Sequence, residues 1–274
     1  MRLYGGRAAL AALLVALSTP AQEGDPLLAR VADEVRRSSE ELPDFICEQV
    51  TWRFDSDSRP PRWRLRDRIQ AEVLYLGGRE VYQNLKRNGR RIDFARAEQT
   101  GTWSTGEFGS LARDLFLPST AARFRFVRET EFRGEPARLY DFEVTQACSH
   151  WRVDFEGQVL YPAYQGSVWI EPQGARLLRI EMQARQVPPS YPLDVIEMSL
   201  EYGPVRIGGA RYLLPVRAEN LACKRQSSYC TYNELIFTNY RRFTTQSVLT
   251  TTDSNITYEL PKAPPEGAGR REPR

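Results

Sequence analysis

Several stretches of this 274-residue chain alternate strictly between apolar and polar residues. Successive side chains of a β-strand point to opposite faces, so this alternation predicts strands with one dry face and one wet face. Such strands are typical of antiparallel sheets, because parallel sheets are covered on both faces and read as continuous apolar runs. The clearest apolar series, in which Asp67 is the one break, consists of Trp63, Leu65, Ile69, Ala71, Val73 and Tyr75.

Turn signals such as Gly77-Gly78, Asn88-Gly89 and Gly208-Gly209 separate these stretches and predict a meander. The expected fold class is mainly β with a few helices, built on a large antiparallel sheet that curls because it is wet on one face. The strand candidates span residues 45–54, 62–76, 80–87, 124–132, 138–145, 151–155, 166–171, 176–185, 195–202, 212–220 and 232–243.

Two helices are expected. The first spans residues 25–42, with Asp25 as the N-cap, Pro26 at the first helical position and Pro43 at the end. The second spans residues 105–117, where a capping Thr105 precedes apolar residues at helical spacing. We expect this second helix to cover the dry face of the sheet.

The two ends of the chain read differently from the middle. Residues 1–21 combine Arg2 and Arg7 with an apolar run from Ala8 to Leu17 and a small-residue cleavage site, which predicts a secretory signal peptide. The run is shorter than the roughly 20 residues of a membrane-spanning helix, and no later segment of the mature chain could span a membrane. We therefore expect a periplasmic or extracellular protein with one β-rich domain over residues 22–260. Residues 261–274, rich in Pro, Gly and charge, are expected to form a disordered tail.

Four cysteines in an oxidising compartment favour structural disulfides. Cys223 and Cys230 bracket a short segment between two strand candidates, so a bridge between them closes one hairpin and leaves Cys47 to pair with Cys148. The alternatives are four buried thiols or a nucleophilic pair of Cys148 with His150.

No catalytic motif is present. The chain lacks GxSxG, HExxH, GxxxxGK[ST], GxGxxG and calcium-loop patterns, and His150 is its single histidine. Asp154 and Glu156 could work as a carboxylate pair, although such pairs are usually solvated charges. We expect no catalytic residue, no cofactor and no metal site, and therefore a protein that is not an enzyme.

The charge is nearly balanced, with 38 Lys plus Arg against 35 Asp plus Glu. Removing the signal peptide lowers the net charge from +3 to +1, which argues against nucleic acid as a partner. Residues 59–91 nevertheless hold ten basic and three acidic residues. This stripe could meet anionic headgroups or an acidic partner, and a solvated strand face is the stronger interpretation.

A dense apolar stretch surrounds the second expected helix. These residues could line a ligand cavity with Phe108 and the helix as a lid, or they could form a plain closed core. The candidate cavity residues are Trp103, Phe108, Leu111, Leu115, Phe116, Phe124 and Phe126.

Residues 164–184, YQGSVWIEPQGARLLRIEMQA, resemble a strand-turn-strand element of the lipoprotein-sorting (LolA-like) half-barrel superfamily. That resemblance implies a strongly curved antiparallel sheet with helices on its concave face and an apolar cavity for acyl chains. The wider chain, with LPDFICEQVTWRF at 42–54, GEFGSLARDLFLP at 106–118 and GGARYLLPV at 208–216, is similar to predicted secreted bacterial proteins of unknown function.

Two functions follow from these observations. The first is a secreted or periplasmic binding or carrier protein for a lipid, an acyl chain or another hydrophobic ligand. The alternative is a structural or regulatory interaction module of the cell envelope, such as a sensor, which binds an envelope protein rather than a small ligand.

Overall fold

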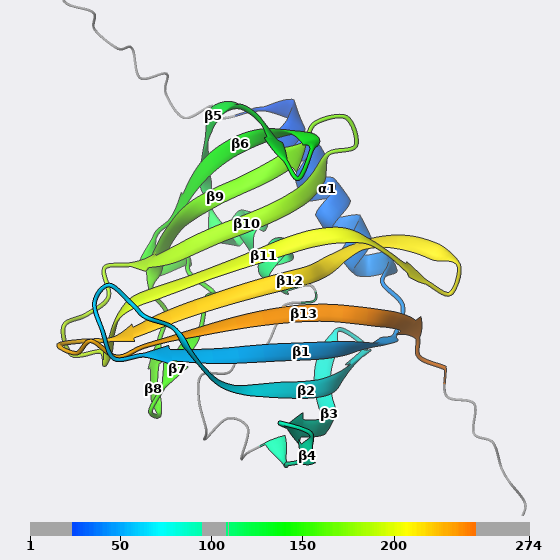
Figure 1. Ribbon diagram of the computed structural model, residues 1–274. Coiled ribbons are helices and arrows are strands. Elements are labelled where there is room, and N and C mark those ends of the chain that lie inside the picture. The colour runs from blue at the N-terminus through cyan, green and yellow to red at the C-terminus, as the bar shows by residue number, and fades with distance from the viewer. Residues whose placement is uncertain (1–23, 95–107, 109, 245–274) are drawn as a thin grey trace, which may run out of the picture. The chain divides into compact units, whose positions relative to one another are not determined.

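The structure, a computed structural model, describes residues 24–94, 108 and 110–244. Most of these residues belong to one antiparallel sheet of eleven strands, as the alternation predicts (Figure 1). Its strands are β1 (Phe45–Ser56), β2 (Arg64–Leu76), β3 (Arg79–Arg87), β4 (Arg90–Arg91), β5 (Arg123–Phe132), β6 (Glu135–Val144), β9 (Ala163–Glu171), β10 (Arg176–Arg185), β11 (Leu193–Ile207), β12 (Ala210–Lys224) and β13 (Cys230–Arg242).

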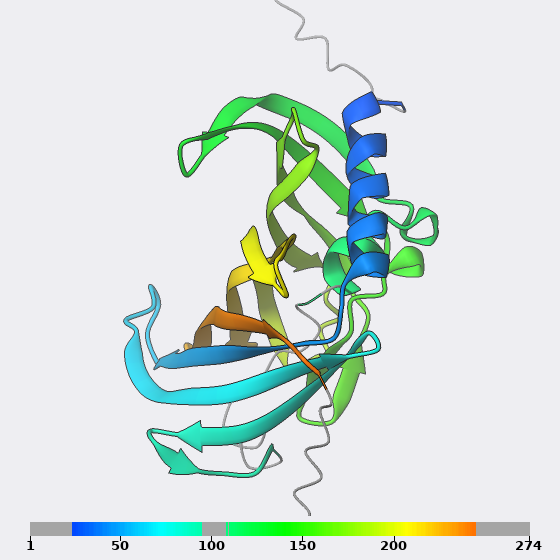
Figure 2. The ribbon, with the colours of Figure 1, turned by 90° about the vertical axis from the view of Figure 1, so that its right-hand side faces the viewer.

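The sheet has the order β4-β3-β2-β1-β13-β12-β11-β10-β9-β6-β5, so neighbours along the chain are mostly neighbours in space. The main exception is the pairing of β1 with β13, which joins the two ends of the described chain. The sheet curves without closing into a barrel, and β4 and β5 form its edges (Figure 2). The expected signal peptide and tail lie outside the described residues.

Helix α1 (Pro26–Glu41) confirms the first predicted helix. Asp25 Oδ1 accepts a hydrogen bond from the backbone N–H of Leu27 at 2.9 Å, and Pro26 occupies the first turn. The other carboxylate oxygen of Asp25 accepts a hydrogen bond from the Tyr140 hydroxyl on β6 at 2.7 Å. One side chain therefore starts the helix and ties it to the sheet.

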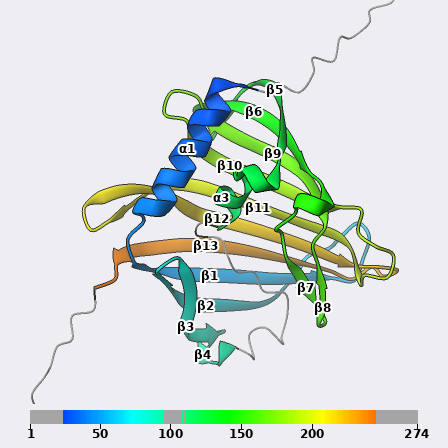
Figure 3. The same ribbon diagram turned by 180° about the vertical axis from the view of Figure 1, so that it is seen from behind.

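Helix α3 (Ser110–Leu115) lies where the second helix was predicted and is shorter than expected. The expected cap, Thr105, lies outside the described residues. A short 3-10 helix, η1 (Pro118–Thr120), follows α3. Figure 3 shows α1 and α3 on the same face of the sheet.

Two large clusters of apolar side chains fill the space on the helix side. The first joins α1 and α3 to β6, β9 and β10 and includes Val31, Leu115 and Ile180. The second lies over β1, β2 and β11 to β13 around Phe45 and Phe108. The predicted dry series is buried at Ile69, Ala71, Val73 and Tyr75. The dry face is therefore the face that the helices cover.

The prediction that Trp63 and Leu65 lie on the dry face is wrong. Trp63 is 40% exposed and Leu65 is 59% exposed. The pairing of β1 with β2 shifts register between Arg53 and Phe54, so Leu65 pairs with Phe54 while Asp67 pairs with Arg53. A bulge of this kind moves the residues beyond it to the opposite face. Trp63 and Leu65 consequently lie on the face away from the helices.

The disulfide between Cys223 and Cys230 is present, with the two Cα atoms 4.0 Å apart on paired positions of β12 and β13. The predicted bridge between Cys47 and Cys148 is wrong. Cys47 lies on β1, whereas Cys148 lies in the 3-10 helix η2 (Gln146–Cys148), which follows β6. Five strands separate β1 from β6 in the sheet, and a disulfide requires Cα atoms within about 7 Å.

The strand expected at 151–155 belongs to a separate hairpin, formed by β7 (Val153–Phe155) and β8 (Gln158–Leu160). Its apolar side chains pack with Tyr191 and Leu193 in a small cluster of their own. None of the helices in the described ranges is long and apolar enough to cross a membrane.

Candidate functional site

The face of the sheet opposite the helices contains a hollow of about 1030 Å³, here called the trough. It crosses seven strands, from β5 and β6 through β9, β10, β11 and β12 to β13. Because neighbouring strands lie about 4.8 Å apart, seven strands give a length of about 29 Å. The trough is thus long and narrow, with Trp63 at one end and Arg123 at the other.

The strand registers arrange the floor of the trough in two parallel rows. The residues of a row lie directly opposite one another on adjacent strands, so they share a face. The first row is Glu143, Gln165, Gln183, Glu197, Leu221 and Tyr232, and the second is Asp141, Ser167, Glu181, Ser199 and Glu219. Alternate residues on the same strands, such as Tyr140 and Ile180, point to the helix-side core.

At the β5 end, two arginines pair with carboxylates of β6. Arg123 lies 2.8 Å from Glu143, and Arg125 lies 2.5 Å from Asp141. Ser167 donates a hydrogen bond to the other oxygen of Asp141 at 2.9 Å. These side chains are largely exposed, so the pairs set the positions of charges and contribute little to stability.

The middle of the trough is built around Arg179, whose side chain is only 13% exposed. Its guanidinium lies 2.7 Å from Glu181, 2.6 Å from Glu201 and 3.5 Å from Glu219. Glu219 also pairs with Arg217 at 2.8 Å. Arg179 is therefore surrounded by carboxylates.

Glu219 lies at the centre of this network. Burial alone would raise the pKa of Glu219, but the hydrogen bond from Tyr232 and the charge of Arg217 outweigh it and hold the pKa below its ordinary value. Conversely, burial and the hydrogen bond to Glu219 raise the pKa of Tyr232 to about 12. The Tyr232 hydroxyl, 2.9 Å from Glu219, stays protonated as a donor at neutral pH.

The opposite end of the trough is aromatic. The Trp63 ring lies 5.5 Å from the Tyr232 ring, which in turn lies 5.8 Å from that of Phe54. Leu221 pairs with Tyr232 across the strands. The trough therefore changes from charged at β5 to aromatic at β13.

Three polar side chains on the floor have no partner among the side chains that the structure describes. Gln165, Gln183 and Glu197 are adjacent members of the first row, on β9, β10 and β11. No side chain of the described residues forms a hydrogen bond or an ion pair with them. They are polar groups in the middle of a hollow that remain available to an occupant.

A second hollow, on the helix side of the sheet, is far smaller. The hollow beside α1 has a volume of about 50 Å³ and is lined by Phe108, Ala112, Tyr202 and residues of α1. Ligand pockets usually measure about 300–1,000 Å³. A hollow of 50 Å³ has room for a few water molecules at most.

Most of the predicted cavity residues that the structure describes pack within the two large apolar clusters. Phe108 is buried against Phe45 and Phe237, and Leu115 is also buried. Leu111 contacts both large clusters.

Three more members of the set are aromatic residues at the β5 end. Phe116 stacks on Phe124, with ring centres 5.2 Å apart, and Phe126 packs edge-on against Tyr140. Phe124 also borders the trough. Trp103 lies outside the described residues. A ligand-binding role for the set remains a prediction.

The residues considered for catalysis lie apart from the trough. Cys148 packs against the first cluster, whereas His150 is exposed in the irregular segment after η2, so the two do not share the face of a strand. Asp154 pairs with Arg152, and Glu156 pairs with Lys224. Within the described ranges, no three His, Cys, Asp or Glu side chains gather into a group that could hold a metal ion.

The sequence contained part of the signal for the trough. Glu181, Gln183, Glu197 and Ser199 are the polar positions of the alternating strands predicted at 176–185 and 195–202, and the alternation by itself predicts that they face solvent. Their placement in a hollow depends on the curvature of the sheet, which the period of two does not encode.

No family model matches the sequence, and no curated protein matches it. Solved structures do resemble it. An outer membrane lipoprotein-sorting protein domain from Vibrio parahaemolyticus is 15% identical, with a TM-score of 0.37 over 82% of this chain and 94% of that one. A DUF1329 family protein from Desulfovibrio piger is 10% identical, with a TM-score of 0.39 over 80% and 94%.

The complex of MucA and MucB from Pseudomonas aeruginosa also resembles the chain, at 12% identity and a TM-score of 0.23 over 77% of this chain and 92% of that one. The first of these structures is described as a domain of the lipoprotein-sorting group that residues 164–184 resemble.

Proposed function

We propose that this chain is a non-enzymatic binding protein of the periplasm or the extracellular space that holds a polypeptide segment of its partner in the trough. The single observation that carries this proposal is the trough itself: about 1030 Å³ of open space across seven strands. The disulfide between Cys223 and Cys230 supports an oxidising compartment.

The shape of the trough favours an elongated occupant. An extended polypeptide rises about 3.3 Å per residue, so the length of about 29 Å accommodates roughly nine residues. Side chains of such a segment would alternate between the floor and solvent. Side chains that face the floor would recur about every 6.6 Å, so four or five of them would contact it along the trough.

The charge of the trough favours a cationic occupant. Its lining includes three arginines (Arg123, Arg125 and Arg179) and five carboxylates (Asp141, Glu143, Glu181, Glu197 and Glu219), a formal sum of −2. The arginines are already paired, whereas Glu197 has no ion-pair partner among the described residues. Charge complementarity therefore selects lysine or arginine side chains, and the aromatic end selects apolar ones.

A purely hydrophobic ligand fits this lining poorly. Eight charged side chains would lose part of their hydration under an acyl chain without gaining hydrogen bonds, and the hollow on the apolar side measures only about 50 Å³. Of the two functions expected from the sequence, the interaction module is therefore the one that the geometry favours.

A peptide titration tests the proposal. The probe is a peptide of about nine residues that alternates lysine with leucine, the number that spans the trough at 3.3 Å per residue. We expect binding at low salt that weakens as salt is added, and no binding of the same peptide with glutamate in place of lysine. Glu197→Lys should weaken binding by about tenfold or more, because an attraction becomes a repulsion.

The matched control is Glu41→Lys, the same change at an exposed position at the end of α1, on the other face of the sheet. It should bind like the unaltered protein. Equal affinity for the lysine and glutamate peptides, or equal loss in both variants, would overturn the proposal.

A further inference from the structure

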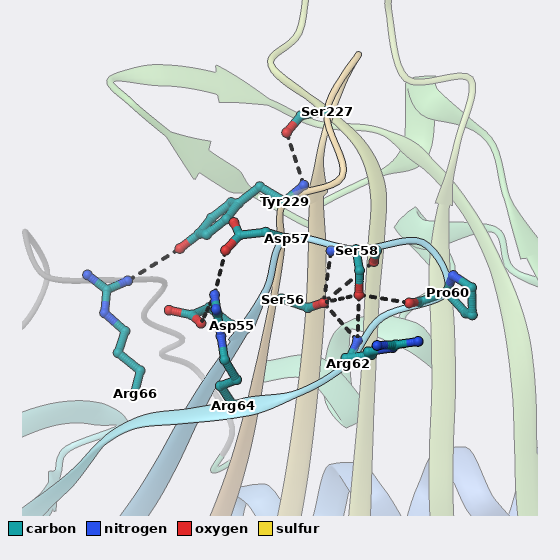
Figure 4. A network of polar contacts seen from close by, with 10 residues as sticks. All are labelled: Asp55, Ser56, Asp57, Ser58, Pro60, Arg62, Arg64, Arg66, Ser227 and Tyr229. Atoms are coloured by element: carbon teal, nitrogen blue, oxygen red, sulfur yellow. Dashed lines mark hydrogen bonds and ion pairs between the residues drawn. The ribbon is translucent and has the colours of Figure 1, made fainter.

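The loop that joins β1 to β2 is held in one shape by its own hydrogen bonds (Figure 4). Ser56, which is fully buried, accepts hydrogen bonds from the backbone N–H groups of Ser58 at 3.2 Å and Arg62 at 2.8 Å. Ser58 Oγ donates to the carbonyl of Pro60 at 3.0 Å. The loop is therefore pre-organised, and what it presents to solvent is presented in a fixed arrangement.

This loop displays an unbroken run of exposed side chains. All eight residues from Arg59 to Arg66 are exposed. They include Trp63 and Leu65, at 40% and 59% exposure, which are two of the six large hydrophobic side chains exposed in the described ranges. Arginines flank Trp63 and Leu65 in the sequence, so basic and apolar side chains are exposed within the same short segment.

The positive charge of the loop is only partly neutralised. Arg64 pairs with Asp55 at 3.4 Å and with Asp57 at 2.5 Å, as Figure 4 shows. The Arg66 guanidinium donates a hydrogen bond to the Tyr229 hydroxyl at 3.4 Å and has no carboxylate of the described residues within ion-pair distance. For the side chain of Arg62, no carboxylate of the described residues lies within ion-pair distance.

The uncompensated charge continues onto the neighbouring strands. The Arg68 guanidinium lies 5.8 Å from the centre of the Trp52 ring. The backbone N–H of Arg68 donates a hydrogen bond to the side-chain oxygen of Asn88, in the turn between β3 and β4. Lys86 lies opposite Gln70 and Arg91 on the paired strands, so Lys86 and Arg91 share the face of Arg68, and both are exposed. A basic surface therefore adjoins the two exposed apolar side chains.

We propose that Arg62, Trp63, Leu65, Arg66 and Arg68, here called the docking patch, bind the protein to an anionic lipid surface. Tryptophan is favoured at the headgroup level of a bilayer, where its ring is partly apolar and its N–H still finds a partner. Arginines beside it add attraction to anionic headgroups. An acidic protein surface would pair with the arginines but would leave Leu65 exposed beside them, so the lipid surface accounts for more of the patch.

Vesicle binding tests this proposal independently of the trough. The probes are vesicles of phosphatidylcholine alone and vesicles that also contain phosphatidylglycerol, compared in a flotation assay. We expect the protein to float with the anionic vesicles at low salt and to be released at high salt. Removing two basic residues with Arg62→Ser and Arg66→Ser should weaken binding by about fivefold for each.

Two double variants separate the patch from general effects. Trp63→Ala with Leu65→Ser should weaken binding to anionic vesicles. Arg79→Ser with Arg206→Ser removes the same charge from exposed positions elsewhere and should have a much smaller effect.

Three outcomes would overturn the proposal: equal binding to the two kinds of vesicle, equal loss in patch and control variants, or binding to an acidic peptide instead of vesicles. The peptide titration with Glu197→Lys tests the trough, so failure of one proposal is distinguishable from failure of the other.

Discussion

Asp67 shows how one polar residue in an apolar series becomes a structural element. Its carboxylate is fully buried and lies 2.7 Å from Arg53, which is 2% exposed, and 2.8 Å from Arg87. Burial alone would raise the pKa of Asp67, but these arginines outweigh it and hold the pKa below its ordinary value. The break in the alternation is thus a buried carboxylate that forms ion pairs with Arg53 and Arg87 on the neighbouring strands. The sequence pattern of one strand does not identify partners on other strands.

Asp67→Asn should strongly destabilise the fold. The substitution removes the negative charge that faces two arginines, and breaking a buried ion pair costs about 3–5 kcal/mol. Urea unfolding measures the loss. Asp57→Asn, at an exposed ion pair, should change the free energy of unfolding by less than about 1 kcal/mol, and similar losses in both variants would contradict the role of Asp67.

The carboxylates with lowered pKa values predict an acid-sensitive fold. In the folded protein, the pKa values of Glu219, Glu171 and Asp67 lie below the ordinary values of these groups. Their stabilising contribution is complete above the unfolded pKa, about 4.3 for glutamate, and is lost as the pH falls through the folded value. The free energy of unfolding should fall below about pH 5, and Glu219→Gln should flatten that fall. A stability independent of pH in this range would contradict the assigned network.

At the scale of elements, the strands and α1 followed from local pattern. Alternation and turn residues located the strands to within a few residues, because side-chain period and Gly-containing turns are local properties. The bulge between Arg53 and Phe54 was not predictable, since it is a property of two paired strands. It is the bulge that brings Trp63 and Leu65 to the open face.

The assignment of faces can be tested on one strand, β10. Ile180 is fully buried, so Ile180→Asp places a charge in the core and should leave the protein largely unfolded. Gln183 lies on the open face of the same strand, and Gln183→Asp should fold normally. Circular dichroism of both variants provides the comparison; two equally folded proteins would mean that the faces are assigned wrongly.

The hairpin of β12 and β13 should depend on its disulfide. Bridging Cys223 and Cys230 closes a loop with a sequence separation of 7 residues, and a loop of this length stabilises by about 2.5 kcal/mol in the chain-entropy estimate. Cys223→Ser with Cys230→Ser should lose about that amount in urea unfolding. Non-reducing peptide mapping should recover the two cysteine peptides linked, and recovering them separately would refute the bridge.

At the scale of the whole molecule, the candidate site arises from curvature. Glu181, Gln183, Glu197 and Ser199 of the trough floor are on predicted wet faces, but only the twist of the sheet turns that face into a hollow. The sequence instead predicts a site among the apolar residues near α3, because a dense run of apolar residues can be recognised without knowing the curvature of the sheet. The trough and the docking patch meet at Trp63, so a protein bound to a lipid surface through the patch would hold the aromatic end of its trough near that surface.

Native mass spectrometry of the mature protein purified from its own envelope is the most direct test of trough occupancy. We predict a bound polypeptide with basic and apolar residues, or a protein free of adducts that takes up the lysine-leucine peptide and fails to do so after Glu197→Lys. A near-stoichiometric acyl-chain lipid that is retained in Glu197→Lys would contradict this function and favour the hydrophobic carrier instead.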